Sequence, residues 1–67
     1  MQDLAMLPPS STLRAFSVVE LIAKSQAPIS LDELTQLSGL PKPTVFRILG
    51  LLVRGGVVAR ESIDKRY

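Results

Sequence analysis

The chain has 67 residues, enough for one small domain but too few for a deep substrate cleft, and this argues against an enzyme. It contains no Cys and no His, so disulfides, the common metal ligands and the most frequent general base are missing, and we expect no cofactor. No apolar run approaches the ~20 residues that span a bilayer. The sequence also lacks the basic N-terminal segment and following apolar core of a signal peptide. We therefore expect a cytoplasmic protein with no membrane partner.

The N-terminal part of the sequence predicts an arm followed by a helix. Residues 1–10 contain two adjacent prolines and little periodicity, so we expect a flexible arm there. Ser11 or Thr12 can cap a helix that runs to about Ser25. The apolar face predicted for this helix contains Ala15, Val18, Val19, Ile22 and Ala23.

The next segment, residues 30–39, predicts a short helix with a defined start and stop. Ser30 and Glu33 have the spacing of a capping box, in which the hydroxyl and the carboxylate each bond a backbone amide of the first turn. Gly39 occupies the position after the helix where a residue of positive φ is favoured. Leucines recur at every third position between them, at Leu31, Leu34 and Leu37.

A second, longer helix is predicted over about residues 41–54. Pro41 and Pro43 open it, and a proline is harmless only in a first turn, where the amides lack an acceptor within the helix, so the helix boundary must lie within those residues. Its apolar face contains Val45, Ile48, Leu49, Leu52 and Val53, with Phe46 at the margin. The turn between the two helices is too short to let them pack side by side, which is typical of a helix-turn-helix.

The other face of this second helix, the recognition helix, is free to contact a partner. A solvated face usually holds several Glu and Lys, but this one holds no acid. Arg can bind guanine O6 and N7 with two hydrogen bonds, and a Thr methyl can pack on a thymine methyl. The face is therefore suited to base edges in the major groove of DNA. It contains Pro43, Thr44, Arg47, Gly50, Leu51 and Arg54.

The distribution of charge favours a phosphate-binding surface. Residues 1–41 carry two basic and four acidic side chains, a net charge of −2, whereas residues 42–67 carry six basic and two acidic ones, a net charge of +4. Clustered cations favour DNA binding because they release condensed counterions, and acids on the same face would repel the backbone.

After the recognition helix the sequence predicts a β-hairpin. Two glycines end the helix, residues 57–60 form a β-type run, residues 62–65 can turn, and residues 66–67 begin a returning strand. This order predicts a mainly α (α+β) fold over residues 11–67. The fold is a three-helix winged helix-turn-helix with a short C-terminal β-hairpin as its wing.

Several segments together resemble a known family. They lie at residues 13–22, 31–34, 39–49 and 56–58, and the run GLPKPTVFR is the most specific of them. They resemble the N-terminal domain of IclR-family transcriptional regulators, over roughly residues 13–67. The resemblance implies a bacterial or archaeal repressor or activator that binds a palindromic operator in double-stranded DNA as a homodimer or tetramer.

The resemblance also implies a second domain. In that family a linker joins the DNA-binding domain to a larger C-terminal domain, through which a small-molecule effector acts. The effector-binding domain is absent from this sequence, which ends inside the expected wing. We therefore interpret the chain as a fragment with a truncated wing.

Eight residues are candidates for contact with DNA. The resemblance places Lys42, Thr44 and Arg47 at the DNA-facing start of the recognition helix. It places Arg60, Lys65 and Arg66 on the wing. Arg54 comes from the exposed helix face, although a cation near a helix end also favours the helix dipole without any ligand. The wing cations could instead only protect an exposed hairpin edge. The candidates are Lys42, Pro43, Thr44, Arg47, Arg54, Arg60, Lys65 and Arg66.

Three positions depart from the family pattern. Pro43 stands where the family usually has Ser, so a hydroxyl and an amide that could reach a phosphate are missing. Phe46 stands where His or Tyr is common, which favours a packing role. Lys65 stands where the wing turn usually has Gly, which predicts a longer or looser hairpin.

Two functions of different classes fit these observations. The first is sequence-specific binding of double-stranded DNA in transcriptional regulation, with the recognition helix in the major groove and the wing on the backbone. The alternative is a winged-helix protein–protein interaction module that uses the same surface. The basic charge of residues 42–66 favours DNA, and the exposed Leu51 favours the alternative.

Apolar residues outside the predicted core suggest self-association. Leu13 and Leu21 lie outside the apolar face of the first helix, and the arm adds Leu4, Met6 and Leu7. The alternative is that these are scattered hydrophobic residues on the surface with no binding role, which is ordinary. In a dimer, the two recognition helices would enter major grooves about one helical turn, or a small multiple of it, apart.

Overall fold

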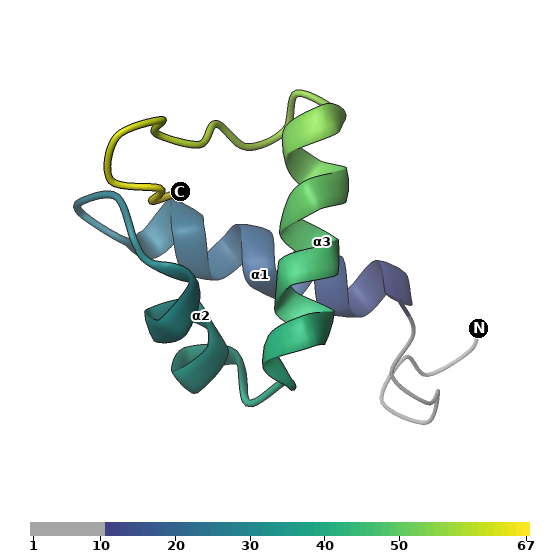
Figure 1. The fold of residues 1–67 in the computed structure, drawn as a ribbon. Helices are drawn as coiled ribbons and strands as arrows, with labels where there is room; N and C mark the ends of the chain where they lie inside the picture. The colour runs from purple at the N-terminus through teal and green to yellow at the C-terminus, as the bar shows by residue number, and fades with distance from the viewer. Residues whose placement is uncertain (1–10) are drawn as a thin grey trace.

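Residues 11–67 fold into three helices (Figure 1). The computed structural model describes residues 11–67, and the arm expected at residues 1–10 lies outside them. Helices α1 (Ser11–Lys24), α2 (Leu31–Ser38) and α3 (Lys42–Arg54) each pack on the other two. Within the described residues, no helix has the length and apolarity needed to cross a bilayer. The three predicted helices are confirmed, with bounds close to those expected.

Helix α1 faces the core along a stripe centred on Val18, whose side chain is fully buried. Leu21 packs on the core, whereas Ala23 is exposed, so the predicted apolar face is rotated toward Leu21. The helix already includes Ser11, so the prediction that Ser11 or Thr12 caps it is wrong. Leu21 is partly buried against the core, so less of its side chain is available to the predicted self-association surface.

Helix α2 has the predicted capping box. The Ser30 hydroxyl accepts a 3.1 Å hydrogen bond from the Glu33 amide, and the Ser30 amide donates to Glu33 Oε1 at 3.4 Å. Gly39 adopts φ 71°, and its amide bonds the Thr35 carbonyl at 3.2 Å. Leu34 is fully buried, but Leu37 is 62% exposed. A spacing of three residues falls short of a helical turn, so the leucines rotate steadily out of the core.

Helix α3 begins after Pro41, which has an extended backbone of φ −60° and ψ 144°. Pro43 lies in its first turn, as predicted. The apolar face enters the core, where Val45 and Leu49 are fully buried and Ile48 nearly so. With Val18, Ile29 and Leu34 they form one contiguous cluster, against which Ala15, Leu21, Ile22, Leu31, Leu40, Leu52 and Tyr67 pack.

The segment after α3 does not form the predicted strands. Residues 11–67 contain no strand, so the β-hairpin wing is not confirmed. The amides of Val57 and Val58 instead donate to the Leu52 carbonyl at 2.9 and 3.3 Å, which closes the end of α3. Val58 is buried. Because these amides are used to end the helix, the β-type run at residues 57–60 does not pair as a strand.

A tight turn follows, and the chain then returns to the start of α2. The Glu61 amide bonds the Arg66 carbonyl at 2.8 Å, and the Lys65 amide bonds the Glu61 carbonyl at 2.9 Å. Ile29 and Tyr67 exchange two backbone hydrogen bonds of 2.9 and 2.8 Å, the arrangement of a hydrogen-bonded pair in antiparallel strands. Figure 1 shows this segment, in yellow, passing from the end of α3 to the loop before α2.

Removal of the Ser30 hydroxyl is expected to destabilise the fold. Ser30→Ala deletes the cap of α2 and should cost about 1 kcal/mol of unfolding free energy, measured by urea denaturation. Ser17→Ala is the matched control, because the Ser17 hydroxyl bonds only the Leu13 carbonyl of its own helix, at 3.1 Å. Equal losses in the two variants would contradict a specific role of the cap.

The same cap predicts a dependence of stability on pH. Hydrogen bonds from the Ser30 hydroxyl and amide, and then from Arg66, hold the pKa of the Glu33 carboxyl below its usual value. Since the folded-state pKa is lowered, the stabilisation is complete above the unfolded-state pKa and is lost as pH falls through the folded-state pKa. The difference in melting temperature between the native protein and Glu33→Gln should therefore shrink on acidification. A difference that stays constant with pH would contradict this assignment.

Candidate nucleic-acid interface

The exposed face of α3 is fixed by the burial of its opposite face. Arg47 and Arg54 are exposed, and Thr44, in the first turn, is half-buried. Two large apolar side chains accompany them, Leu51 at 56% exposure and Phe46 at 60%. No acidic residue occurs in α3. The helix therefore presents cations, a hydroxyl and apolar groups together on its solvent side.

Two acids of α2 are paired with cations. Lys42 Nζ lies 2.8 Å from Asp32 Oδ1, and Arg66 Nη1 lies 3.0 Å from Glu33 Oε1. Both carboxylates lie in the first turn of α2, where negative charge also favours the helix dipole. The pairing reduces the repulsion that these acids would exert on an approaching anion.

One group of residues meets between α1 and α3, along α3 from Thr44 to Leu52. Thr44 and Arg47 line a pocket of about 220 Å³ with Ser11 and Arg14 of α1. The side-chain Nε of Arg14 is buried and has no hydrogen-bond partner within the described part of the chain. Sequence reasoning missed Arg14. Its position four residues before the buried Val18, on the core-facing stripe of α1, was the available signal.

A second group meets at the end of α3. Arg54 and Arg60 line a pocket of about 310 Å³ together with Phe46 and Tyr67. Leu49, Gly50 and Val53 complete it. The turn after α3 therefore brings a further cation to the C-terminal half of the recognition helix.

The remaining candidates have different surroundings. Pro43 is exposed at the start of α3. Lys65 is exposed and adopts a φ of 55°, the left-handed region that favours Gly, which explains why a Gly would suit this turn. Arg66 is half-buried, and its Nη1 also bonds the Pro28 carbonyl at 3.3 Å, so it fastens the C-terminal segment to the loop before α2.

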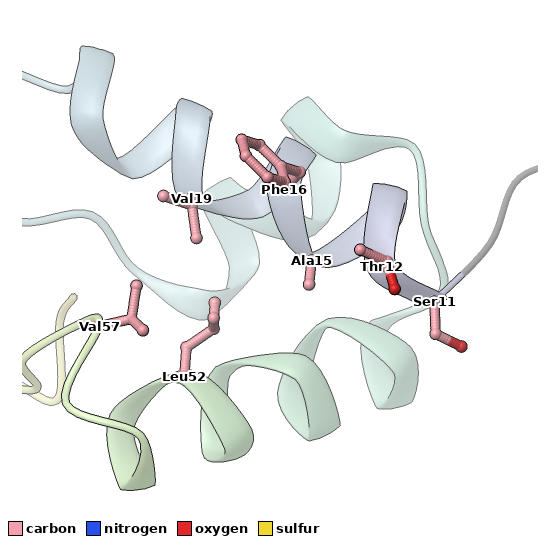
Figure 2. A pocket seen from close by; sticks show the side chains of 7 residues that line it. All are labelled: Ser11, Thr12, Ala15, Phe16, Val19, Leu52 and Val57. Atoms are coloured by element: carbon pink, nitrogen blue, oxygen red, sulfur yellow. The ribbon is translucent and has the colours of Figure 1, made fainter. Parts of the chain in front are cut away.

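An apolar groove lies between α1 and the end of α3, and it shares Ser11, Ala15 and Leu52 with the pocket that contains Arg14. Its volume is about 470 Å³. Figure 2 shows Ala15 and Val19 of α1 facing Leu52 of α3 and Val57 across it. Phe16, at its rim, is 64% exposed.

The comparison with protein families decides the identity of this arrangement. The model of the IclR helix-turn-helix domain matches residues 7–62. The chain belongs to the IclR family. A probable transcriptional regulator, SauR of Cupriavidus necator, is 34% identical to this IclR-family chain over 58 residues, which cover 87% of the chain and 23% of the relative. This chain thus spans about a quarter of the length of that relative. No solved structure matches it. These findings support DNA binding in transcription regulation.

Proposed function

We propose that this domain binds double-stranded DNA sequence-specifically and directs a transcriptional repressor or activator to its operator in the cytoplasm. The observation that carries the proposal is the exposed face of α3, which holds Thr44 and Arg47 and no acid, on a helix whose other face is buried. A helix held in this way can enter the major groove and keep a constant orientation toward the base edges.

The cations around α3 divide into two roles under this proposal. Arg47 reads base edges, because a guanidinium can make two hydrogen bonds to one guanine. Lys42, Arg54, Arg60 and Lys65 contact phosphates, which fixes the position of the domain but not its sequence preference. Pro43 lacks an amide hydrogen, so its contribution is limited to van der Waals contact.

Arg66 has a supporting role. Its guanidinium is bonded to Glu33 and Pro28, so it holds the turn at residues 61–66 against the start of α2. That turn serves as a short wing, and its exposed Lys65 is the group that reaches the DNA backbone.

A protein-docking module is the second candidate function. Leu51 and Phe46 favour it, because both are large apolar side chains exposed on α3. The cations around them favour DNA, because a docking surface for protein is usually depleted of charge at its centre. The two functions differ in whether duplex DNA binds at low salt.

Two substitutions test the DNA proposal. Duplexes that bind the intact protein are selected from a random library, and the recovered sites are titrated with Arg47→Ala and Lys65→Asn. Arg47→Ala should cost about 1–3 kcal/mol on the preferred site and relax its sequence. Lys65→Asn should weaken all duplexes alike, and Asn tolerates the positive φ.

Three outcomes are informative in this experiment. A palindromic consensus that degrades at defined positions in Arg47→Ala supports operator recognition through α3. Equal losses from both substitutions on every sequence would leave only nonspecific DNA binding. The absence of duplex binding at low salt would favour the protein-docking module.

We also propose that the intact protein binds its palindromic operator as a homodimer or tetramer through α1, and that a small-molecule effector acts through a further domain. The apolar groove beside α1 and the exposed Phe16 support a self-association surface. Leu13, at 41% exposure, lies on the same helix. A symmetric dimer would then match the symmetry of a palindromic site.

A charge placed on this surface tests the assembly. Phe16→Glu should raise the dissociation constant of the oligomer at least ~10-fold, because an unpaired carboxylate would be buried between subunits. Leu37→Glu is the matched control, since Leu37 of α2 is 62% exposed, close to the 64% of Phe16. Light scattering over a concentration series measures both. A monomer at all concentrations in the native protein would contradict the proposal.

A further inference from the structure

The pocket between α1 and α3 that contains Arg14 has two arginines and two hydroxyl-bearing residues in its lining, drawn from the two helices. We propose that it binds one phosphate of the DNA backbone, with Arg14 as its principal ligand. This inference rests on the proposed function and extends it, because Arg14 and Ser11 of α1 join α3 in contacting the duplex. The phosphate fixes how deeply α3 enters the groove.

Arg14 has the properties expected of a phosphate ligand. Its Nε is buried and has no hydrogen-bond partner, and within residues 11–67 no carboxylate pairs with it. A buried donor without a partner is costly, so a shift of the Arg14 side chain that lets this N–H reach a phosphate oxygen in the pocket is favoured. The guanidinium presents several N–H groups in one plane, which matches two oxygens of a phosphate.

The rest of the pocket is complementary to an anion of this size. Ser11 and Thr44 supply hydroxyl groups that can donate hydrogen bonds, and Arg47 supplies a second positive charge. The start of the 14-residue helix α1 lies at the pocket, so the positive end of its dipole adds to the field. The remaining wall is apolar and lowers the local dielectric, which strengthens each of these interactions; it consists of Ala15, Ile48, Leu51 and Leu52.

The placement of the pocket selects a backbone phosphate and not a base. It lies beside the exposed face of α3, between that helix and α1. A helix in the major groove is flanked by the two sugar–phosphate backbones, so a helix packed at its side meets phosphate groups first. Arg14 is therefore a positioning contact that is indifferent to sequence, whereas Arg47, which is exposed on α3, remains able to read bases.

Neutralisation of Arg14 tests the inference. Arg14→Met keeps the apolar stem and removes the charge, and Lys24→Met, at the other end of α1, is the matched control. On the selected duplex, Arg14→Met should weaken binding about tenfold. It should lower the slope of log K against log salt by about 0.9, the value of one phosphate contact. The consensus sequence should stay unchanged. Lys24→Met should leave affinity and slope as they are.

A second measurement identifies the phosphate itself. Neutral methylphosphonate linkages are placed singly along the selected duplex. At one position the native protein should lose about tenfold in affinity, and Arg14→Met should lose nothing further. Arg14→Lys, which keeps a charge and the stem, should retain the salt slope but bind less tightly than the native protein, and it replaces Arg14→Met if that variant unfolds.

The outcomes separate this inference from the proposed function. If the native protein selects no duplex, the DNA-binding proposal fails. If it selects a duplex that Arg14→Met binds with unchanged affinity and salt slope, only the phosphate pocket is overturned. The inference would also be overturned if, at every methylphosphonate position, the loss of affinity from the neutral linkage simply added to the loss from Arg14→Met. Additive losses would mean that Arg14 contacts none of these phosphates.

Discussion

The arrangement of this domain depends on the short connection between α2 and α3. Gly39 turns the chain with a positive φ, and Pro41 starts the next helix from an extended backbone. The two residues between Ser38 and Pro41 leave no length for α3 to run back along α2 as an antiparallel partner. Helix α3 must therefore cross the others with one side on the core, and its other side stays in solvent. The candidate interface is a consequence of this turn.

Features encoded by neighbouring residues could be predicted from the sequence. The capping box of Ser30 and Glu33, the left-handed Gly39 and the prolines at the start of α3 all act over three or four residues, and each was found as expected. The orientation of α1 could not be obtained in the same way. Leu21 is partly buried because of what packs against it from elsewhere, and hydrophobicity alone does not separate it from Ala23.

The C-terminal segment and Arg14 were mispredicted or missed for a related reason. The amides of Val57 and Val58 have two competing partners, a returning strand or the last carbonyls of α3, and the geometry of the helix end favours the second. Arg14 acquires its significance only when Thr44 and Arg47, about thirty positions away in the sequence, come beside it. Long-range placement of this kind leaves little trace in residue spacing.

Both ends of the segment that carries α2 and α3 are held together. Ile29 and Tyr67 exchange backbone hydrogen bonds, and the Arg66 side chain adds bonds to Glu33 and Pro28. Residues 29–67 thus form a closed loop without a covalent link, and its backbone entropy is already lost when the protein folds. A partner that docks on α3 has only exposed side chains left to immobilise, chiefly the long cationic ones. Association is then opposed mainly by the rotamer entropy of a few lysines and arginines, while the helix itself behaves as a preorganised rigid body.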